Sequence, residues 1–354
     1  MSVDPSGAPD SGRLRRLAPW LWTGGSLLLL LVLNSAVGPV TIPPGTVVRL
    51  LLDRLGLAAG PVDAPGTFST ILFDIRFPHT ALMAMAGLAL GASGAAYQGL
   101  FRNPLADPYI LGVAAGAGLG AITAMTIHWP STVLGMATVP AAAFVGAIAT
   151  VGVVYRIARV GRSAPVTTLL LAGVAVGTFT SAITSLILLL STSELRRAIS
   201  WLLGGFSLGG WQPVLASLPY LLVGIGTLVA LRRPINVLQF GDEEALQLGL
   251  DVERFKLFIV AAASLVAATA VAFTGIIAFV GLIVPHLVRI LWGYDYRRLI
   301  PLAALGGGAV LLAADIAART VLAPRDLPVG IITSVIGAPF FLWLLRRAKN
   351  EVFW

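Results

Sequence analysis

The sequence predicts an all-α integral membrane protein: one domain over residues 1–354, built as a bundle of ten transmembrane helices. Three observations lead to this prediction. Only 11% of the 354 residues are charged, against roughly 25% in a soluble domain. Hydrophobic residues make up 57% of the chain, and the mean hydropathy is +0.90. The apolar residues come in long runs, and positive residues cluster at the ends of these runs.

The number of spans follows from the lengths of the apolar runs. An apolar helix needs about 20 residues to cross about 30 Å of hydrocarbon. The stretch from Phe258 to Trp292 is apolar for 35 residues and would reach about 53 Å as one helix, so it must turn. Thr274–Gly275 is the natural break. The predicted spans are 18–37, 79–99, 108–128, 138–157, 166–190, 211–231, 256–274, 276–292, 300–318 and 329–346.

The first span needs a separate decision, because it resembles a signal peptide. Arg13, Arg15 and Arg16 precede its apolar run, and a short polar segment follows. The run is long for a signal-peptide core, and many further spans follow it. We therefore interpret it as a retained first helix behind a cytoplasmic tail of residues 1–17.

The distribution of positive charge supports ten spans with both termini on the cytoplasmic side. In that arrangement the inner segments hold 17 of the 24 lysines and arginines, and the outer segments hold 7. An excess of cations on the inner side is typical of membrane proteins. The net charge of +8 therefore reflects orientation in lipid. No basic stripe with interleaved aromatic residues is present, so we expect no nucleic-acid partner.

Two longer segments lie between the predicted spans. Residues 38–75 form an outer loop, with a short helix expected near 47–57. Residues 232–255 form a cytoplasmic loop of mixed charge that contains a short helical pattern.

Small residues recur every four positions on two of the spans. This spacing places them on one helix face, where small side chains let helices approach closely in lipid. The pattern predicts a tightly packed bundle. The residues concerned are Gly87, Gly91, Ala95 and Gly99 on the second span, and Gly112, Gly116 and Gly120 on the third.

The fifth span carries a similar stripe of Gly173, Gly177, Ser181 and Ser185. Two interpretations stay open for its hydroxyl groups. They could line a polar translocation path, or each could donate a hydrogen bond to the carbonyl four residues earlier.

Ionisable residues are almost absent within the spans. Asp315 is the exception, and its spacing from Arg319 predicts an ion pair on one helix face. A carrier driven by protons or sodium is expected to place carboxylates nearer the midplane. His79, His128 and His286 are scattered, without the spacing of metal ligands.

Several classes of enzyme are excluded. The chain has no cysteine, no serine-hydrolase or zinc-protease motif, and no paired carboxylates within the spans. Neither Lys256 nor Lys349 follows a glycine, so the phosphate-binding loop of ATPases is missing. We expect no enzyme activity and no bound cofactor. If ATP drives this protein, ATP and Mg²⁺ bind another chain.

Several strings resemble the FecCD family, the permeases of iron-siderophore, haem and cobalamin ABC importers. The resemblance covers nearly the whole chain from about residue 38, and FRNPLADP and FVGLIVPHLVR are its most specific motifs. The strings are IRFPH (75–79), AGLALGASGAAYQGLFRNPLADPYILGVAAGAGLGA (86–121), LLLAGVAVG (169–177), WLLGGFSLGGW (201–211), FTGIIAFVGLIVPHLVR (273–289), ADIAAR (314–319) and DLPVGIITSVIGAPFFLWLL (326–345).

The resemblance implies a homodimer in the bacterial or archaeal inner membrane, two cytoplasmic ATPase subunits and a periplasmic or lipid-anchored substrate-binding protein. It also implies a coupling helix for the ATPase near 239–250, with Ala245, Leu246, Leu248 and Gly249 as its residues. The composition of this stretch suits a short helix with one apolar face and a tight end. An ordinary amphipathic turn would have a similar pattern.

The resemblance further assigns the outer arginines to docking of the binding protein. These are Arg76, Arg319 and, as a helper, Arg325, which would pair with carboxylates of the binding protein. The family usually has an arginine where this chain has His79, which makes this contact absent or pH-sensitive.

In the same way, the cytoplasmic gate is assigned to the turn with Asn103 and Leu105 and to Val166 and Thr167 at the start of the fifth span. A plain loop is the alternative. Segment 191–207 most resembles the cobalamin members. The cargo is expected to be a cobalamin or other corrinoid, haem, or a ferric siderophore. The rival functions are an ion-driven secondary transporter and an intramembrane enzyme.

Overall fold

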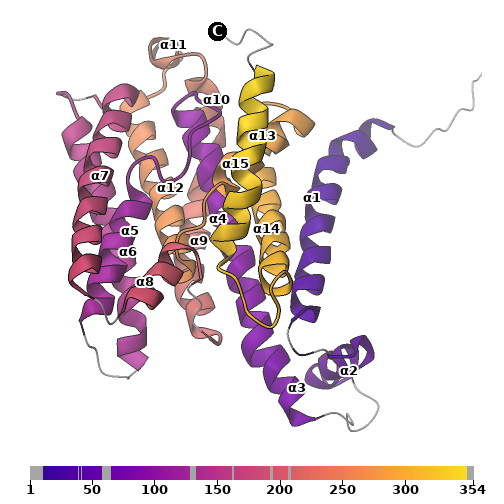
Figure 1. The fold of residues 1–354 in the computed structure, drawn as a ribbon. Helices are drawn as coiled ribbons and strands as arrows, with labels where there is room; N and C mark the ends of the chain where they lie inside the picture. The colour runs from indigo at the N-terminus through magenta and orange to yellow at the C-terminus, as the bar shows by residue number, and fades with distance from the viewer. Residues whose placement is uncertain are drawn as a thin grey trace, which may run out of the picture.

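The computed structural model describes residues 11–38, 40, 42–57, 65–127, 133–161, 163–191, 194–205 and 209–348, and the regular secondary structure of this part consists of helices (Figure 1). Seven of its helices are long and apolar enough to cross a membrane, and three shorter apolar helices accompany them. The ten predicted spans are thereby confirmed. Their helices are α1 (Ser11–Ala36), α4 (Phe77–Leu100), α5 (Val113–Thr126), α6 (Val133–Ala158), α7 (Val166–Leu190), α9 (Gln212–Ala230), α12 (Val252–Thr274), α13 (Val280–Trp292), α14 (Tyr296–Thr320) and α15 (Val329–Ala348).

Short helices occupy the two ends of the bundle. The beginning of α1 and the end of α15 lie at the same end as α11, as ten crossings require (Figure 1). The opposite end carries α2 and α3. The segment 191–207 contains α8, and its residues 192, 193, 206 and 207 lie outside the described part. The short helices are α2 (Pro44–Arg54), α3 (Gly66–Thr70), η1 (Ile71–Arg76), α8 (Leu195–Leu202), α10 (Arg232–Leu238) and α11 (Asp242–Gln247).

Helix α4 lies at the centre of the bundle and packs against α14, α12, α13 and α9. Its glycines allow this. A Cβ atom added to Gly87 would lie 2.3 Å from the carbonyl oxygen of Gly307, and one added to Gly91 would lie 2.0 Å from that of Ala303. Because backbones meet at these points, any larger side chain would push α4 and α14 apart. The predicted packing role of this stripe is confirmed.

Helices α5 and α6 form a second close pair by the same means. A Cβ atom on Gly116 would lie 2.4 Å from the carbonyl oxygen of Gly146, and one on Gly120 would lie 2.0 Å from that of Ala142. Close packing of small residues therefore joins helices in both halves of the bundle.

The break at Thr274–Gly275 is confirmed, but the following span begins later than predicted. Gly275 ends α12 with a φ of +78°, and α13 starts only at Val280. The irregular segment between them is buried at Ile277, whose carbonyl accepts a hydrogen bond of 2.9 Å from the Tyr109 hydroxyl. The third span likewise begins at Val113, not at residue 108. The hydropathy pattern did not distinguish these two irregular segments from helix, because loops buried in protein are as apolar as helices.

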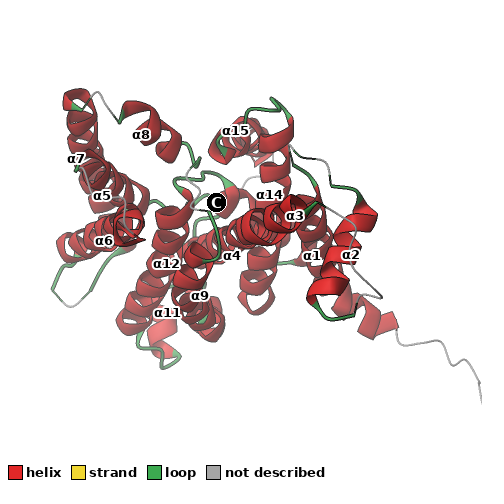
Figure 2. Cartoon of the chain, turned by 90° about the horizontal axis from the view of Figure 1, so that it is seen from below, coloured by secondary structure: helices red, strands yellow, loops and turns green. Residues whose placement is uncertain are grey.

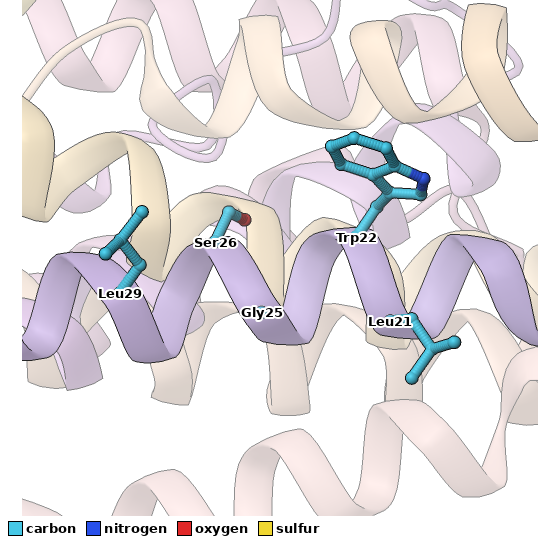
Figure 3. Close-up of a pocket in the computed structure, with 5 residues that line it drawn as sticks. All are labelled: Leu21, Trp22, Gly25, Ser26 and Leu29. Carbon is cyan, nitrogen blue, oxygen red and sulfur yellow. The ribbon is translucent and has the colours of Figure 1, made fainter.

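Helix α1 lies at the edge of the bundle and packs mainly on α14. Its outward face is apolar and exposed. Leu21, Trp22, Gly25, Ser26 and Leu29 line an open hollow along this face (Figure 3). An apolar face of this kind on a spanning helix is suited to contact with lipid.

Candidate docking and gating sites

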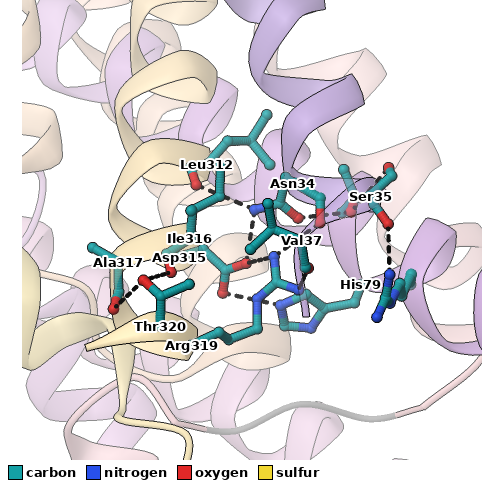
Figure 4. A network of polar contacts seen from close by, with 12 residues as sticks. Asn34, Ser35, Val37, His79, Leu312, Asp315, Ile316, Ala317, Arg319 and Thr320 are labelled. Atoms are coloured by element: carbon teal, nitrogen blue, oxygen red, sulfur yellow. Dashed lines mark hydrogen bonds and ion pairs between the residues drawn. The ribbon is translucent and has the colours of Figure 1, made fainter. Parts of the chain in front are cut away.

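A cluster of charged side chains joins α1, α4 and α14 at the end of the bundle that carries α2 and α3 (Figure 4). Asp315 is at its centre. Its carboxylate forms an ion pair of 2.8 Å with Arg319, accepts a hydrogen bond of 2.8 Å from the Asn34 amide, and lies 3.0 Å from Nε2 of His79. The predicted pairing of Asp315 with Arg319 is confirmed. We call Arg76, His79, Asp315, Arg319 and Asn34 the outer cluster.

The two buried arginines of the outer cluster also bind the last turn of α1. Nη1 of Arg76 donates to the carbonyl of Ala36 at 2.8 Å, and Nη1 of Arg319 donates to that of Val37 at 2.9 Å. The final carbonyls of a helix lack partners within the helix and carry partial negative charge, so cations stabilise this end. The arginines therefore cap α1.

The predicted docking residues differ in how far they are accessible. Arg76 and Arg319 are 5% and 11% exposed, whereas Arg325 lies on the surface. Arg76 also donates to the Val40 carbonyl. Its guanidinium group lies close to Gly38, because a Cβ atom added to Gly38 would be 2.7 Å from Nη2 of Arg76. Docking by these residues stays a prediction. Sequence reasoning did not foresee their role in capping α1.

The predicted gate turn follows α4 at the opposite end. The Asn103 side chain accepts a hydrogen bond of 2.9 Å from the amide of Leu105, two residues on, and Arg102 has a φ of +50°. Asn103 is exposed and Leu105 is half-buried. Asn103 therefore shapes the turn, since asparagine can bond the backbone two residues ahead.

Asp107 and Tyr109 stabilise the segment that directly follows this turn. The Asp107 carboxylate accepts a hydrogen bond of 2.8 Å from the amide of Tyr109, and burial raises the pKa of Asp107 to about 6. The Tyr109 hydroxyl bonds the Ile277 carbonyl in the irregular segment before α13. Sequence reasoning missed both residues. The Asp-x-Tyr spacing, which repeats that of Asn103 and Leu105, was the available signal.

The second predicted gate segment is the start of α7. Pro165 precedes the helix, Val166 is half-buried and Thr167 is exposed. Among the residues that the structure describes, no hydrogen bond joins Val166 or Thr167 directly to the turn at Asn103. The connection between the two gate segments runs through the inner loop.

The stripe on α7 changes its environment along its length. Gly173 is buried, and a Cβ atom there would lie 2.3 Å from the carbonyl oxygen of Ile110. Gly177 is half-buried, while Ser181 and Ser185 are exposed. Residues spaced four apart on an α-helix are offset by about 40° at each step. The later residues of this stripe therefore no longer face the backbone at Ile110 that Gly173 contacts. Ser185 donates to the carbonyl of Ser181 at 2.9 Å, the local bond expected of helical serines, and the translocation path stays a prediction.

Helix α11 has the predicted short form and tight end. Ala245 is buried and holds α11 to the bundle, whereas Leu246 and Leu248 are 64% and 68% exposed. Gly249 ends the element with a φ of +83°. Phe240, just before α11, is also exposed and was not predicted. Three large apolar side chains therefore stand on the surface at the end of the bundle where α1 begins and α15 ends.

The described residues thus form a bundle of apolar, membrane-spanning helices with a buried charged cluster at one end. The family model described as the FecCD transport family matches residues 26–347. The chain belongs to the FecCD transport family. It is a membrane permease subunit of an ABC transporter and a transport component, not an enzyme. Such a permease works with ATPase and substrate-binding partners.

Relatives match along most of the chain. The cobalamin import system permease protein BtuC of Halobacterium salinarum is 43% identical over 94% of this chain and 96% of its own. The uncharacterized ABC transporter permease protein YvrB of Bacillus subtilis is 40% identical over 95% of both chains. The hemin transport system permease protein HmuU of Yersinia pestis is 40% identical over 79% of this chain and 84% of its own.

A solved structure of similar fold covers 93% of this chain and 98% of its own, with a TM-score of 0.78 and 25% sequence identity. It is described as an inward-facing conformation of a metal-chelate type ABC transporter.

Proposed function

We propose that this chain is the permease of an ATP-driven importer for a metal chelate or macrocycle, namely a corrinoid such as cobalamin, haem, or a ferric siderophore. The observation that carries the proposal is the 43% identity to a cobalamin import permease across nearly the whole of both chains. The match to a hemin permease is nearly as strong, so the cargo is given as a class. In bacteria or archaea the protein lies in the inner membrane.

In this proposal the chain works as a homodimer, with the translocation path between the two copies. The exposure of Ser181 and Ser185 on α7 supports this arrangement, because hydroxyl groups facing a shared path are hydrated, whereas lipid would not hydrate them. Helices α8 and α15 lie along one side of the bundle with α7 at its edge (Figure 2). That side is the proposed contact between copies.

The end of the bundle that carries α11, the start of α1 and the end of α15 is proposed to face the cytoplasm. This orientation agrees with the excess of positive residues in the segments at that end. Leu246, Leu248 and Phe240 would then contact the ATPase subunits, which bind ATP and Mg²⁺, and Ala245 and Gly249 would set the position and end of α11. This chain binds no cofactor of its own.

The outer cluster would then face the substrate-binding protein. Arg325 is the accessible cation for a first contact with its carboxylates, whereas Arg319 is largely buried. His79 takes part through its contact with Asp315. Closure of the gate on the cytoplasmic side is assigned to Asn103, Leu105, Val166 and Thr167.

Reconstitution into proteoliposomes tests the proposal. The purified chain, its ATPase and its binding protein are assembled, and uptake of cyanocobalamin, hemin and ferric desferrioxamine is measured in parallel. ATP-dependent uptake of at least one of these compounds is expected, and none with an ATPase that cannot hydrolyse ATP. Uptake by the chain alone under a proton or sodium gradient would overturn the proposal in favour of a secondary transporter.

A further inference from the structure

Lys256, near the start of α12, is one of two lysines in the chain and is 2% exposed. Its ammonium group donates to the carboxylates of Asp242 and, at 3.3 Å, Glu253. A buried ammonium is costly unless it is paired and hydrogen-bonded. The two carboxylates therefore hold Lys256 in place, and it holds them.

Each carboxylate also reaches one of the two predicted gate segments. The second oxygen of Glu253 accepts a hydrogen bond of 2.8 Å from the amide of Ala164, two residues before α7 begins. The second oxygen of Asp242 lies 3.8 Å from the guanidinium group of Arg102, in the turn after α4. We call these five residues the Lys256 hub. Through it, the start of α7 and the Asn103 turn are connected to each other.

The Lys256 hub is continuous with α11. Asp242 is the first residue of that helix, Leu246 is exposed one turn later, and Leu248 is exposed directly after the helix ends. An α-helix of six residues held by the ion pairs of Asp242 and by the buried Ala245 is short enough to be displaced as a unit. A force applied to Leu246 and Leu248 therefore reaches Asp242, and from there Lys256 and Arg102.

The exposure of the hub residues suits a contact that changes during a cycle. Asp242 and Glu253 are 42% and 34% exposed at their side chains, so water can replace a lost partner at little cost. Lys256 cannot be hydrated without moving. The ammonium group of Lys256 is thus the fixed part of the hub. The two carboxylates, and the gate segments that they contact, are the parts that can exchange partners.

We infer that the Lys256 hub transmits displacement of α11 to both cytoplasmic gate segments, with Lys256, Asp242 and Glu253 as positioning residues. The inference rests on the proposed function, in which α11 contacts the ATPase. It adds the path by which that contact moves the gate. Without the hub, α11 would still bind the ATPase, but the start of α7 and the Asn103 turn would no longer follow it.

The test compares Lys256→Met with Arg254→Met in the complete reconstituted transporter. Methionine keeps the apolar stem of Lys256 and removes its charge. Arg254 is an exposed cation on the same helix, so its variant removes the same charge without touching the hub. Transport of the compound carried by the unmodified complex, ATP hydrolysis and the amount of bound ATPase are measured together.

In Lys256→Met we expect about a tenfold fall in transport per ATP hydrolysed, with the ATPase bound in unchanged amount. Arg254→Met should retain the original ratio. Equal ratios in both variants, in a folded complex, would overturn the inference and leave the proposed function intact. Absence of ATP-dependent transport in the unmodified complex would instead overturn the proposed function.

A second measurement follows the gate directly. The chain has no cysteine, so Leu105→Cys introduces a single reactive thiol in the gate turn. With the hub intact, its rate of maleimide labelling should change when ATP is added. Adding Asp242→Asn, which weakens the hub without burying an unpaired charge, should remove this change. An unaltered response in Asp242→Asn would contradict the inference even if Lys256→Met proved unstable.

Discussion

The outer cluster and the Lys256 hub both bury a cation at an end of the bundle, but they neutralise it differently. In the outer cluster the carboxylate itself is buried, and the arginines also bind carbonyls of α1. In the hub only Lys256 is buried, while Asp242 and Glu253 remain partly in water. The outer cluster is therefore built as a rigid support, and the hub as a joint whose contacts can exchange.

The largest expected difference between the outer cluster and the Lys256 hub is in the free energy of unfolding that is lost when one of their charged groups is removed. Asp315→Asn removes the carboxylate that neutralises Arg319 in a buried site, so we expect a loss of about 3–5 kcal/mol in the free energy of unfolding. Lys256→Met should cost clearly less, because its carboxylates can be hydrated. Unfolding in mixed detergent micelles measures both.

Asp326→Asn is the control, since Asp326 is an exposed carboxylate at the same end as Asp315. It should change the free energy of unfolding by less than about 0.5 kcal/mol. If Asp315→Asn were equally mild, the outer cluster would not be the rigid support described above.

The next effect concerns the surface beside the hub. The double substitution Leu246→Ser and Leu248→Ser should weaken binding of the ATPase more than about tenfold, because burying an exposed leucine side chain in an interface is worth about 1.5–3 kcal/mol. The unfolding free energy should stay within about 0.5 kcal/mol, since both side chains are exposed. Co-purification of the ATPase and unfolding of the permease alone are the two measurements. Unchanged ATPase binding would remove α11 from the interface.

A smaller effect is expected at the accessible arginine of the outer end. Arg325→Glu should weaken binding of the substrate-binding protein several-fold at low salt, mainly through slower association, with no loss of stability. Raising the ionic strength should shrink the difference. A salt-independent defect, or one accompanied by unfolding, would show that Arg325 belongs to the rigid support and not to the docking surface.

The smallest effect is a pH dependence at the gate turn. Burial raises the pKa of Asp107 to about 6, above its unfolded value near 3.8. The protonated form is therefore favoured by folding, so stability is highest below pH 4 and declines as pH rises through 6. Between pH 5 and 7.5 the original chain should lose about 1 kcal/mol more than Asp107→Asn. Parallel curves for the two proteins would place Asp107 in water.

The spans could be predicted from sequence because a bilayer imposes two strong constraints, length and the side on which cations lie. The break at Gly275 followed from the same length argument. The late start of α13 did not, because the buried segment before it is as apolar as a helix and its backbone is satisfied by Tyr109, which is 168 residues away in sequence.

The sites show the same limit. The pairing of Asp315 with Arg319 is local and could be predicted from the four-residue spacing, but Asn34 and His79 reach Asp315 across 281 and 236 residues. The short form of α11 was predictable from its composition and its glycine. The Lys256 hub was not, because it combines a turn, a loop amide and two helices whose meeting depends on the whole fold.

The cap on α1 has a consequence for biosynthesis. Helix α1 leaves the ribosome well before its main packing partner, α14, and before the Arg319 and Asp315 that close its end. Until they arrive, α1 is held by its own hydrophobicity and by its smaller contacts with α4 and Arg76. Its final docking reports that the chain has been inserted as far as α14, which makes a loosely attached α1 a signature of partial insertion that quality-control proteases could recognise.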